Sequence, residues 1–266
     1  MRPIARRLIC STVTLFLCLI ASGCASYRTP GAGVDLAGIS GDDAQDIGEL
    51  MRREPASPFP ARMALVRAQS PGYATRGGAS CHGEGQFCVV TSRDVEREAD
   101  FRRLGQLPLM AAVAPVGRLI LPRRLDTVRD VRIAAAALKA DLVMVYSLDT
   151  RFEVDSTPIG PLALISLGLL PNKQAQVLTT ASGALFDVRS GFVYGTVEWT
   201  ARESQRATFW STEDAIDSAR RKAETDAFQG LVDQFEDLWI EIVSDETDAT
   251  RPAPPSRRTA LRQWPV

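Results

Sequence analysis

The sequence predicts an α/β fold, with residues 59–243 forming a single domain in which helices flank a mixed central sheet of about five strands. Three observations predict it. Short apolar runs of strand character are separated by helical segments. Residues 176–200 alternate apolar and polar side chains around a central turn, as in a hairpin. Residues 211–243 repeat apolar side chains at the spacing of one long C-terminal amphipathic helix.

The first 23 residues have the organisation of a secretory signal peptide. Three arginines precede the apolar run at residues 8–20, which is shorter than the about 20 residues that a transmembrane helix needs. The run ends in ASGC, and the small residues before Cys24 resemble the lipobox of bacterial lipoproteins. This resemblance implies cleavage after residue 23 and lipidation of Cys24, with acyl chains such as palmitate as the anchor. The alternative is an ordinary signal peptide followed by an incidental cysteine.

Residue 25 bears on the choice between the two bacterial membranes. It is Ala rather than the Asp that retains many such lipoproteins at the inner membrane. The resemblance therefore implies the periplasmic face of the outer membrane.

The sequence predicts little regular structure at either end of the mature chain. Residues 24–58, rich in small residues, Asp and Pro, are expected to form a flexible lipid-anchored tether with one short helix at 43–53. Residues 244–266 are expected to form a disordered tail rich in Pro and Arg, since they bury too little apolar surface to fold. The tail is either a frayed end or a cationic arm for an acidic partner.

The predicted periplasmic location decides how the remaining cysteines are interpreted. Two of the five cysteines leave with the signal peptide and Cys24 takes the lipid, so Cys81 and Cys88 remain. In an oxidising periplasm an even pair predicts a disulfide. The alternative is a metal site that also uses His82, but it would supply three ligands and no second cluster. We therefore expect a disulfide, no metal, and His82 as an exposed loop residue.

The first half of the domain predicts two strands, a helix and a bent strand. Residues 61–69 and 86–92 have strand character, with the cysteine loop between them. Residues 93–105 form a charged amphipathic helix. Residues 108–121 carry a strand that Pro115 bends or places at an edge.

The second half contains the clearest elements. Residues 126–140 predict a helix, because an alanine-rich body follows Asp126 in N-cap position. Residues 141–154 form a strand that is buried on both sides at its start. Residues 176–188 and 192–200 pair as a hairpin, and the closing helix begins with a capping box at Ser211.

An apolar insertion, residues 156–174, interrupts this pattern. Three prolines break it, and its continuous apolar character lacks the alternation of a pore-lining strand. It is expected to contact a membrane surface, contact a neighbouring subunit, or fill its own domain's core. Its candidate contact residues are Leu162, Leu164, Ile165, Leu167, Leu169 and Leu170.

No catalytic motif stands out in the sequence. It contains no G-x-S-x-G, no Walker loop and no H-E-x-x-H, and its one histidine lies in the cysteine loop. A glycosidase needs two carboxylates, but the spacing of the acidic pairs does not distinguish them from solvated faces. We therefore expect no catalytic residues and no cofactor. The pairs are Glu96 and Glu98, Glu153 and Asp155, and Glu236 and Asp237.

Two short motifs carry a resemblance to a known group of proteins. Ala140-Asp141-Leu142 enters a strand within KADLVMVYSLD, and a turn at 187–191 lies within ALFDVRSGFVYG. With the order of elements over residues 60–243, they resemble the amino-terminal fold of TolB. That group includes the curli-secretion channel lipoprotein, the Pel-polysaccharide export lipoprotein and the lipoprotein activator of penicillin-binding proteins. The resemblance implies scaffolding, secretion or activation rather than catalysis.

The net charge and the predicted lipid anchor limit the kinds of partner that this chain can have. Without the three arginines of the signal peptide, 28 basic side chains stand against 32 acidic ones, a net charge of −4, which does not favour nucleic acid. We expect a non-enzymatic envelope lipoprotein that scaffolds, activates or assists an assembly or export complex. It would contact the membrane through its N-terminal lipid and an unidentified envelope protein. Self-association into a homo-oligomer stays open. The alternatives are a periplasmic carboxylate-dependent hydrolase and a subunit of a secretion channel.

Overall fold

The computed structural model confirms the predicted α/β class, with a seven-stranded mixed sheet instead of about five strands. The strand of this sheet that the sequence did not predict is the two-residue strand Cys81–His82 in the cysteine region. The structure describes residues 32–35, 47–75, 78, 81–156, 173–207 and 212–249. The signal peptide, Cys24 and the six candidate contact residues of the apolar insertion lie outside this described part.

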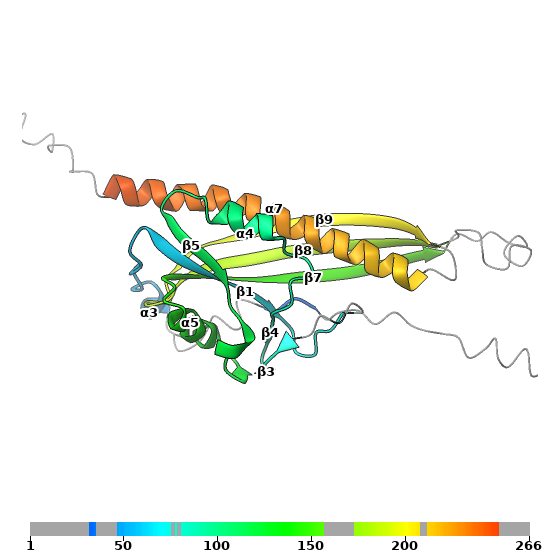
Figure 1. The fold of residues 1–266 in the computed structure, drawn as a ribbon, viewed down its shortest axis with the longest axis horizontal. Helices are drawn as coiled ribbons and strands as arrows, with labels where there is room; N and C mark the ends of the chain where they lie inside the picture. Colours follow the sequence, from blue (N-terminus) through cyan, green and yellow to red (C-terminus); the bar gives the residue numbers. More distant parts are fainter. Residues whose placement is uncertain are drawn as a thin grey trace, which may run out of the picture.

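Four strands form the body of the sheet (Figure 1): β1 (Ala61–Gln69), β7 (Leu142–Ser156), β8 (Lys173–Asp187) and β9 (Val193–Ala207). β1 runs parallel to β7, and β7, β8 and β9 pair antiparallel in that order. The sequence predicted the β8–β9 hairpin. It did not reveal that β7 and β8 pair along all 15 residues of each strand, because the apolar insertion separates them in the chain.

The outer edge of β1 is shared by two short strands. β5 (Met110–Pro115) runs parallel to its first half, and β4 (Cys88–Val90) runs antiparallel to its last residues. β2 (Cys81–His82) pairs with β4. β3 (Glu84–Gly85) and β6 (Arg124–Leu125) form a separate pair. Pro115 ends β5, and a 3₁₀ turn, η1 (Arg118–Ile120), follows where the sequence predicted more strand.

One face of the sheet is covered by α7 (Thr212–Ala249) and α4 (Glu98–Leu104), as Figure 1 shows. α7 packs mainly on β8 and β9. Its buried face carries the predicted apolar repeat, and Trp239 is core, with its indole N–H donating to the carbonyl of Pro108 at 2.7 Å. No helix in the described ranges is long and apolar enough to cross a membrane. The α7 side chains in the main core are Ala227, Phe228, Leu231, Val232, Phe235 and Trp239.

The other face is covered only in part. α5 (Val128–Ala137) packs over the β1–β7 region and forms a second core with Val143, Val145 and Phe186. Its N-cap is Thr127 rather than Asp126, because the carboxylate of Asp130 accepts from the backbone N–H of Thr127 in a capping box. On this face, most of β9 carries exposed or half-buried side chains. We call the β8–β9 surface opposite α7 the open face.

Parts of the predicted tether pack against the domain. The backbone N–H of Ala56 and the hydroxyl of Ser57 both donate to Asp187 at 2.8 Å, and Phe59, the first residue of the predicted domain, packs on Trp239. The predicted short helix is a single turn, α3 (Ile47–Leu50), in the described part. At the other end, α7 continues six residues beyond the predicted domain boundary at 243.

A glycine in α7 gives the first testable prediction. A Cβ added at Gly230 would lie 2.2 Å from the indole of Trp199 on β9, so a larger residue must displace that ring. Alanine normally favours a helix over glycine by about 1 kcal/mol. We expect Gly230→Ala instead to destabilise the domain by about 1–3 kcal/mol, because overpacking outweighs helix propensity. Denaturant unfolding measures this change. The double variant Gly230→Ala/Trp199→Ala should show less than the summed loss, and stabilisation by Gly230→Ala alone would contradict the packing.

Candidate functional site

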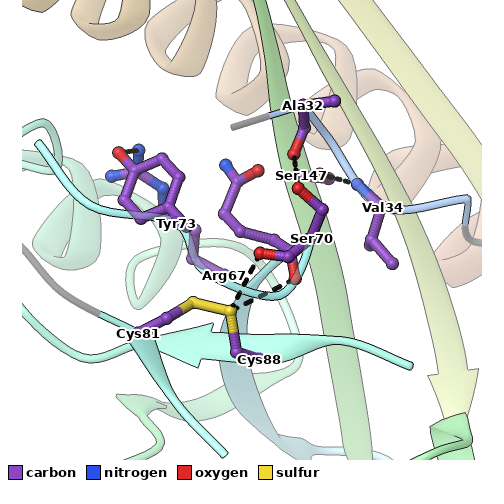
Figure 2. The surroundings of a disulfide bond; sticks show 9 residues. Ala32, Val34, Arg67, Ser70, Tyr73, Cys81, Cys88 and Ser147 are labelled. Carbon is purple, nitrogen blue, oxygen red and sulfur yellow. Dashed lines mark hydrogen bonds between the residues drawn. A yellow bond between two sulfur atoms is a disulfide. The ribbon is translucent and has the colours of Figure 1, made fainter. Parts of the chain in front are cut away.

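The predicted disulfide is confirmed and joins β2 to β4. Cys81 and Cys88 have an S–S distance of 2.09 Å and a Cα–Cα distance of 5.4 Å (Figure 2). Both sulfurs are used, which removes the alternative of a metal site with His82. His82 itself is half-buried in β2 opposite Val89, so the prediction of an exposed loop residue is wrong. Among the described residues, no three His, Cys, Asp or Glu side chains cluster to hold a metal.

The disulfide lies beside a docked N-terminal segment, residues 32–35. The carbonyl of Ala32 accepts from the hydroxyl of Ser70 at 2.7 Å, and the N–H of Val34 donates to Ser147 Oγ at 2.8 Å (Figure 2). Gly33 forms a β-bridge with Gln69 at the end of β1. The segment therefore joins the end of β1 to the middle of β7.

Gly33 suits this close approach, because a larger residue would need Ser147 or Asp149 to shift by a few tenths of an ångström. A Cβ at this position would lie 3.0 Å from Ser147 Oγ and 3.2 Å from the Cβ of Asp149. This closely packed glycine lies nine positions after Cys24, inside the part that the sequence predicted as tether.

The docked segment also lines a groove on the open face. The groove has a volume of about 520 Å³. Val34 contributes from the docked segment, Phe186 from β8 and Val193 from β9, while Ser182, Thr196 and Glu198 supply polar groups. A groove lined by apolar side chains together with a few polar groups is typical of a binding surface.

The densest polar group in the described part lies on the opposite face, between β1 and α7. We call Arg67, Asp94, Glu96, Arg220 and Glu224 the ionic cluster. Arg67, from β1, contacts Asp94 at 3.1 Å, Glu96 at 3.4 Å and Glu224 at 3.5 Å. Arg220, one helical turn before Glu224 in α7, binds Glu224 at 2.5 Å. Both arginines and Glu224 are at most 2% exposed.

Hydroxyl groups complete the cluster. Arg67 donates to Tyr73 Oη at 2.7 Å, Tyr146 donates to Glu96 at 2.5 Å, and Thr150 donates to Glu224 at 3.1 Å. Tyr73 also packs against Cys88, so the disulfide region closes one side of the cluster.

The burial of the ionic cluster shifts the pKa values of its side chains. Burial raises the pKa of Glu224, and the positive charges of Arg67 and Arg220 offset this shift only in part. Burial also raises the pKa of Tyr146 and that of Tyr73 above the usual range of a phenol. Burial alone would lower the pKa of Arg67, but Glu96 and its other neighbours raise it. Arg67 therefore keeps its charge, and its carboxylate partners depend on that charge.

These contacts give the cluster a structural role. Each carboxylate of the cluster lies within 4 Å of an arginine, and both tyrosines are held as neutral hydrogen-bonding phenols. The cluster ties β1 to the first third of α7 and to the segment after β4.

One acidic prediction is corrected by the cluster. Glu96 was expected on a solvated face, but it is 8% exposed, because Arg67 offsets its charge and Tyr146 donates a hydrogen bond to it. Glu98 is exposed and pairs with Arg93, as a solvated residue does. Glu236 pairs with the half-exposed Arg103. The side chains of Glu153 and Asp155 lie outside the described part.

The second predicted motif forms a turn held by Asp187. Its carboxylate accepts hydrogen bonds from the N–H groups of Arg189 and Ser190, and from Ala56 and Ser57 of the preceding segment. Burial opposes ionisation, but these donors leave the pKa of Asp187 below its usual value. Ser57 Oγ also lies 2.8 Å from the carbonyl oxygen of Asp141, which brings the two motifs together at one end of the sheet.

Comparisons with known proteins give no family assignment. No family model matches the sequence, and no curated protein matches it. Among solved structures, a Xanthomonas campestris protein of the family DUF330 is 17% identical, with a TM-score of 0.35, over 74% of this chain and 93% of its own. A neuraminyllactose-binding hemagglutinin homologue from Helicobacter pylori is 12% identical, with a TM-score of 0.34, over 73% and 94%.

A third similar structure is the rare lipoprotein B from Shewanella oneidensis. It is 10% identical, with a TM-score of 0.28, over 71% of this chain and 99% of its own. These identities and TM-scores are too low to bear on function.

The ionic cluster gives the second prediction. Arg67→Met leaves Glu96 and Glu224 buried without their central charge, so we expect a loss of about 3–5 kcal/mol at pH 7. Loss of Arg67 raises the folded-state pKa of Glu224 further. When the pKa of a carboxyl is higher in the folded state than in the unfolded state, its protonation stabilises the fold. This stabilisation is fully present at pH values below the unfolded-state pKa, and it is lost as the pH rises through the folded-state pKa. The deficit should therefore shrink toward acid pH.

Denaturant unfolding between neutral and acid pH measures both effects. Arg103→Met is the matched control, because it breaks a half-exposed pair with Glu236 and should cost about 0–1 kcal/mol. Arg67→Lys keeps a charge and should lose less than Arg67→Met. An Arg67→Met deficit no larger than that of the control, or one that grows toward acid pH, would contradict the assignment.

Proposed function

We propose that this chain is a lipid-anchored, non-enzymatic protein of the periplasmic face of the outer membrane, which scaffolds, activates or assists an envelope assembly or export complex. The observation that carries the proposal is the docking of residues 32–35. It joins the domain to a point nine residues after the predicted lipid site, Cys24.

The docking of residues 32–35 limits the distance between the domain and the membrane. Eight peptide units separate Cys24 from Ala32, and an extended chain of that length spans at most about 29 Å. A tether that extended to residue 58 would reach several times as far. The groove beside Val34 is therefore held within a short distance of the lipid surface.

The disulfide supports the same compartment. A bond between Cys81 and Cys88 forms and persists in an oxidising environment such as the periplasm. The apolar residues of the insertion, which connects β7 to β8, are proposed as a second contact with the membrane or with a partner.

Capture of the partner in living cells tests this function. A photo-crosslinking amino acid at Thr196 in the groove, or at Leu167 in the insertion, should capture an envelope assembly or export protein, or lipid at Leu167. Ser218 is the control, because it is exposed on α7 away from the groove. The purified lipoprotein should change the activity of the captured protein and should not cleave cell-wall glycans alone. Glycan cleavage that a carboxylate substitution abolishes would favour the hydrolase instead.

The anchor gives a separate prediction. Cys24→Ala removes the lipidated thiol, so we expect the variant to leave the outer-membrane fraction while the Cys81–Cys88 disulfide still forms. Fractionation and mass spectrometry measure the two outcomes. Thr259→Ala, in the C-terminal tail, should fractionate as the parent chain does. Retention of Cys24→Ala in the outer membrane to the same extent would place the anchor elsewhere.

A further inference from the structure

β9 is a long edge strand whose outer side is unpaired in the described part of the chain. It runs for 15 residues at the end of the sheet and pairs only with β8. An unpaired strand of this length presents a row of free N–H and C=O groups, which favours addition of another strand. Trp199, near the middle of β9, is a large aromatic side chain that is 45% exposed.

The side chains of β9 alternate between the two faces of the sheet. On the open face, Thr200 Oγ1 lies 2.9 Å from Thr180 Oγ1, and Glu198 accepts from Ser182 Oγ at 2.9 Å. On the other face, Trp199 lies on Gly230 of α7. Glu198, Thr200 and Arg202 therefore share the open face.

We infer that β9 is a dimer interface, which pairs antiparallel with β9 of a second copy about a twofold axis at Thr200. Thr200 is the central residue of β9, so this register gives the two strands their longest overlap, which is irregular only near the bulge at Tyr194. It places Glu198 opposite Arg202 of the second copy, and the symmetry repeats that pair. It also places the large Trp199 opposite the small Ala201. Directly opposite side chains have Cβ atoms about 4.5–5.5 Å apart, within reach of an ion pair.

Neighbouring registers lack this complementarity. A twofold axis at Trp199 or Ala201 places both charges opposite neutral residues. An axis at Glu198 or at Arg202 places like charges opposite each other, which is unfavourable. Arg202 is exposed and has no carboxylate partner among the described residues, so it is available for the second copy.

The symmetry fits attachment of both copies to one membrane. A twofold axis perpendicular to the sheet keeps the two open faces on the same side. Because Val34 and Asp35 line the groove on that face, both N-terminal segments leave on the same side of the dimer.

Cysteine crosslinking in the full-length anchored protein tests the register. Thr200→Cys places the only free thiol on the axis, since Cys81 and Cys88 are bonded and Cys24 is acylated in the anchored protein. A short bismaleimide should give a covalent dimer. Ser204→Cys is the matched control on the same strand and face. Its two copies would lie about 26 Å apart in this register, so it should not crosslink. Equal crosslinking of both variants, or none with Thr200→Cys, would overturn the proposal.

A charge exchange tests the pairing independently. Glu198→Arg creates two like-charge pairs per dimer, so the dissociation constant, measured by sedimentation in detergent, should rise about tenfold. Arg202→Glu should do the same. The double variant Glu198→Arg/Arg202→Glu restores opposite charges and should recover the dimer, although it also lacks the Ser182 hydrogen bond. A monomeric parent chain, or a double variant as weak as the single ones, would refute the interface.

Discussion

The packing of α7 on the sheet depends on the buried charge of Arg67. Six of the eight buried positions of β1 are apolar, yet Arg67 points into the interface with α7 and is 2% exposed. A buried guanidinium is tolerated only where carboxylates surround it. The segment after β4 supplies Asp94 and Glu96, and α7 supplies Glu224. Three separate parts of the chain must therefore be in place together.

Most of the fold could be predicted from the sequence because its main elements have strong local patterns. The apolar repeat of α7, the alternation of β8 and β9 and the turn at Asp187 are each contained within one stretch of chain. The pairing of β7 with β8 is not local, because 16 residues of the insertion separate Ser156 from Lys173. The two-residue strands of the cysteine region are too short to show a period.

The functional residues also divide into those with a local signal in the sequence and those whose partners are distant in the chain. The disulfide could be predicted because the compartment leaves only two cysteines. The burial of Glu96 could not be predicted, because its partners Arg67 and Tyr146 lie far away in the sequence, on β1 and β7. A signal was present in α7, where Arg220 and Glu224 lie beside the apolar positions Ala219 and Ala223. Charges inside an apolar stripe indicate buried partners elsewhere in the fold.

The docked N-terminal segment had no such signal, because backbone groups make most of its contacts. Ala32 uses its carbonyl, Val34 uses its N–H, and Gly33 contributes the absence of a side chain. None of these contacts requires an apolar pattern, so the segment has the composition of a linker. Its position nevertheless links two regions that are distant in sequence, since it joins the end of β1 to the middle of β7 beside the open face. A chain anchored before this segment would therefore keep the open face, and not only the N-terminus, within a limited distance of the membrane.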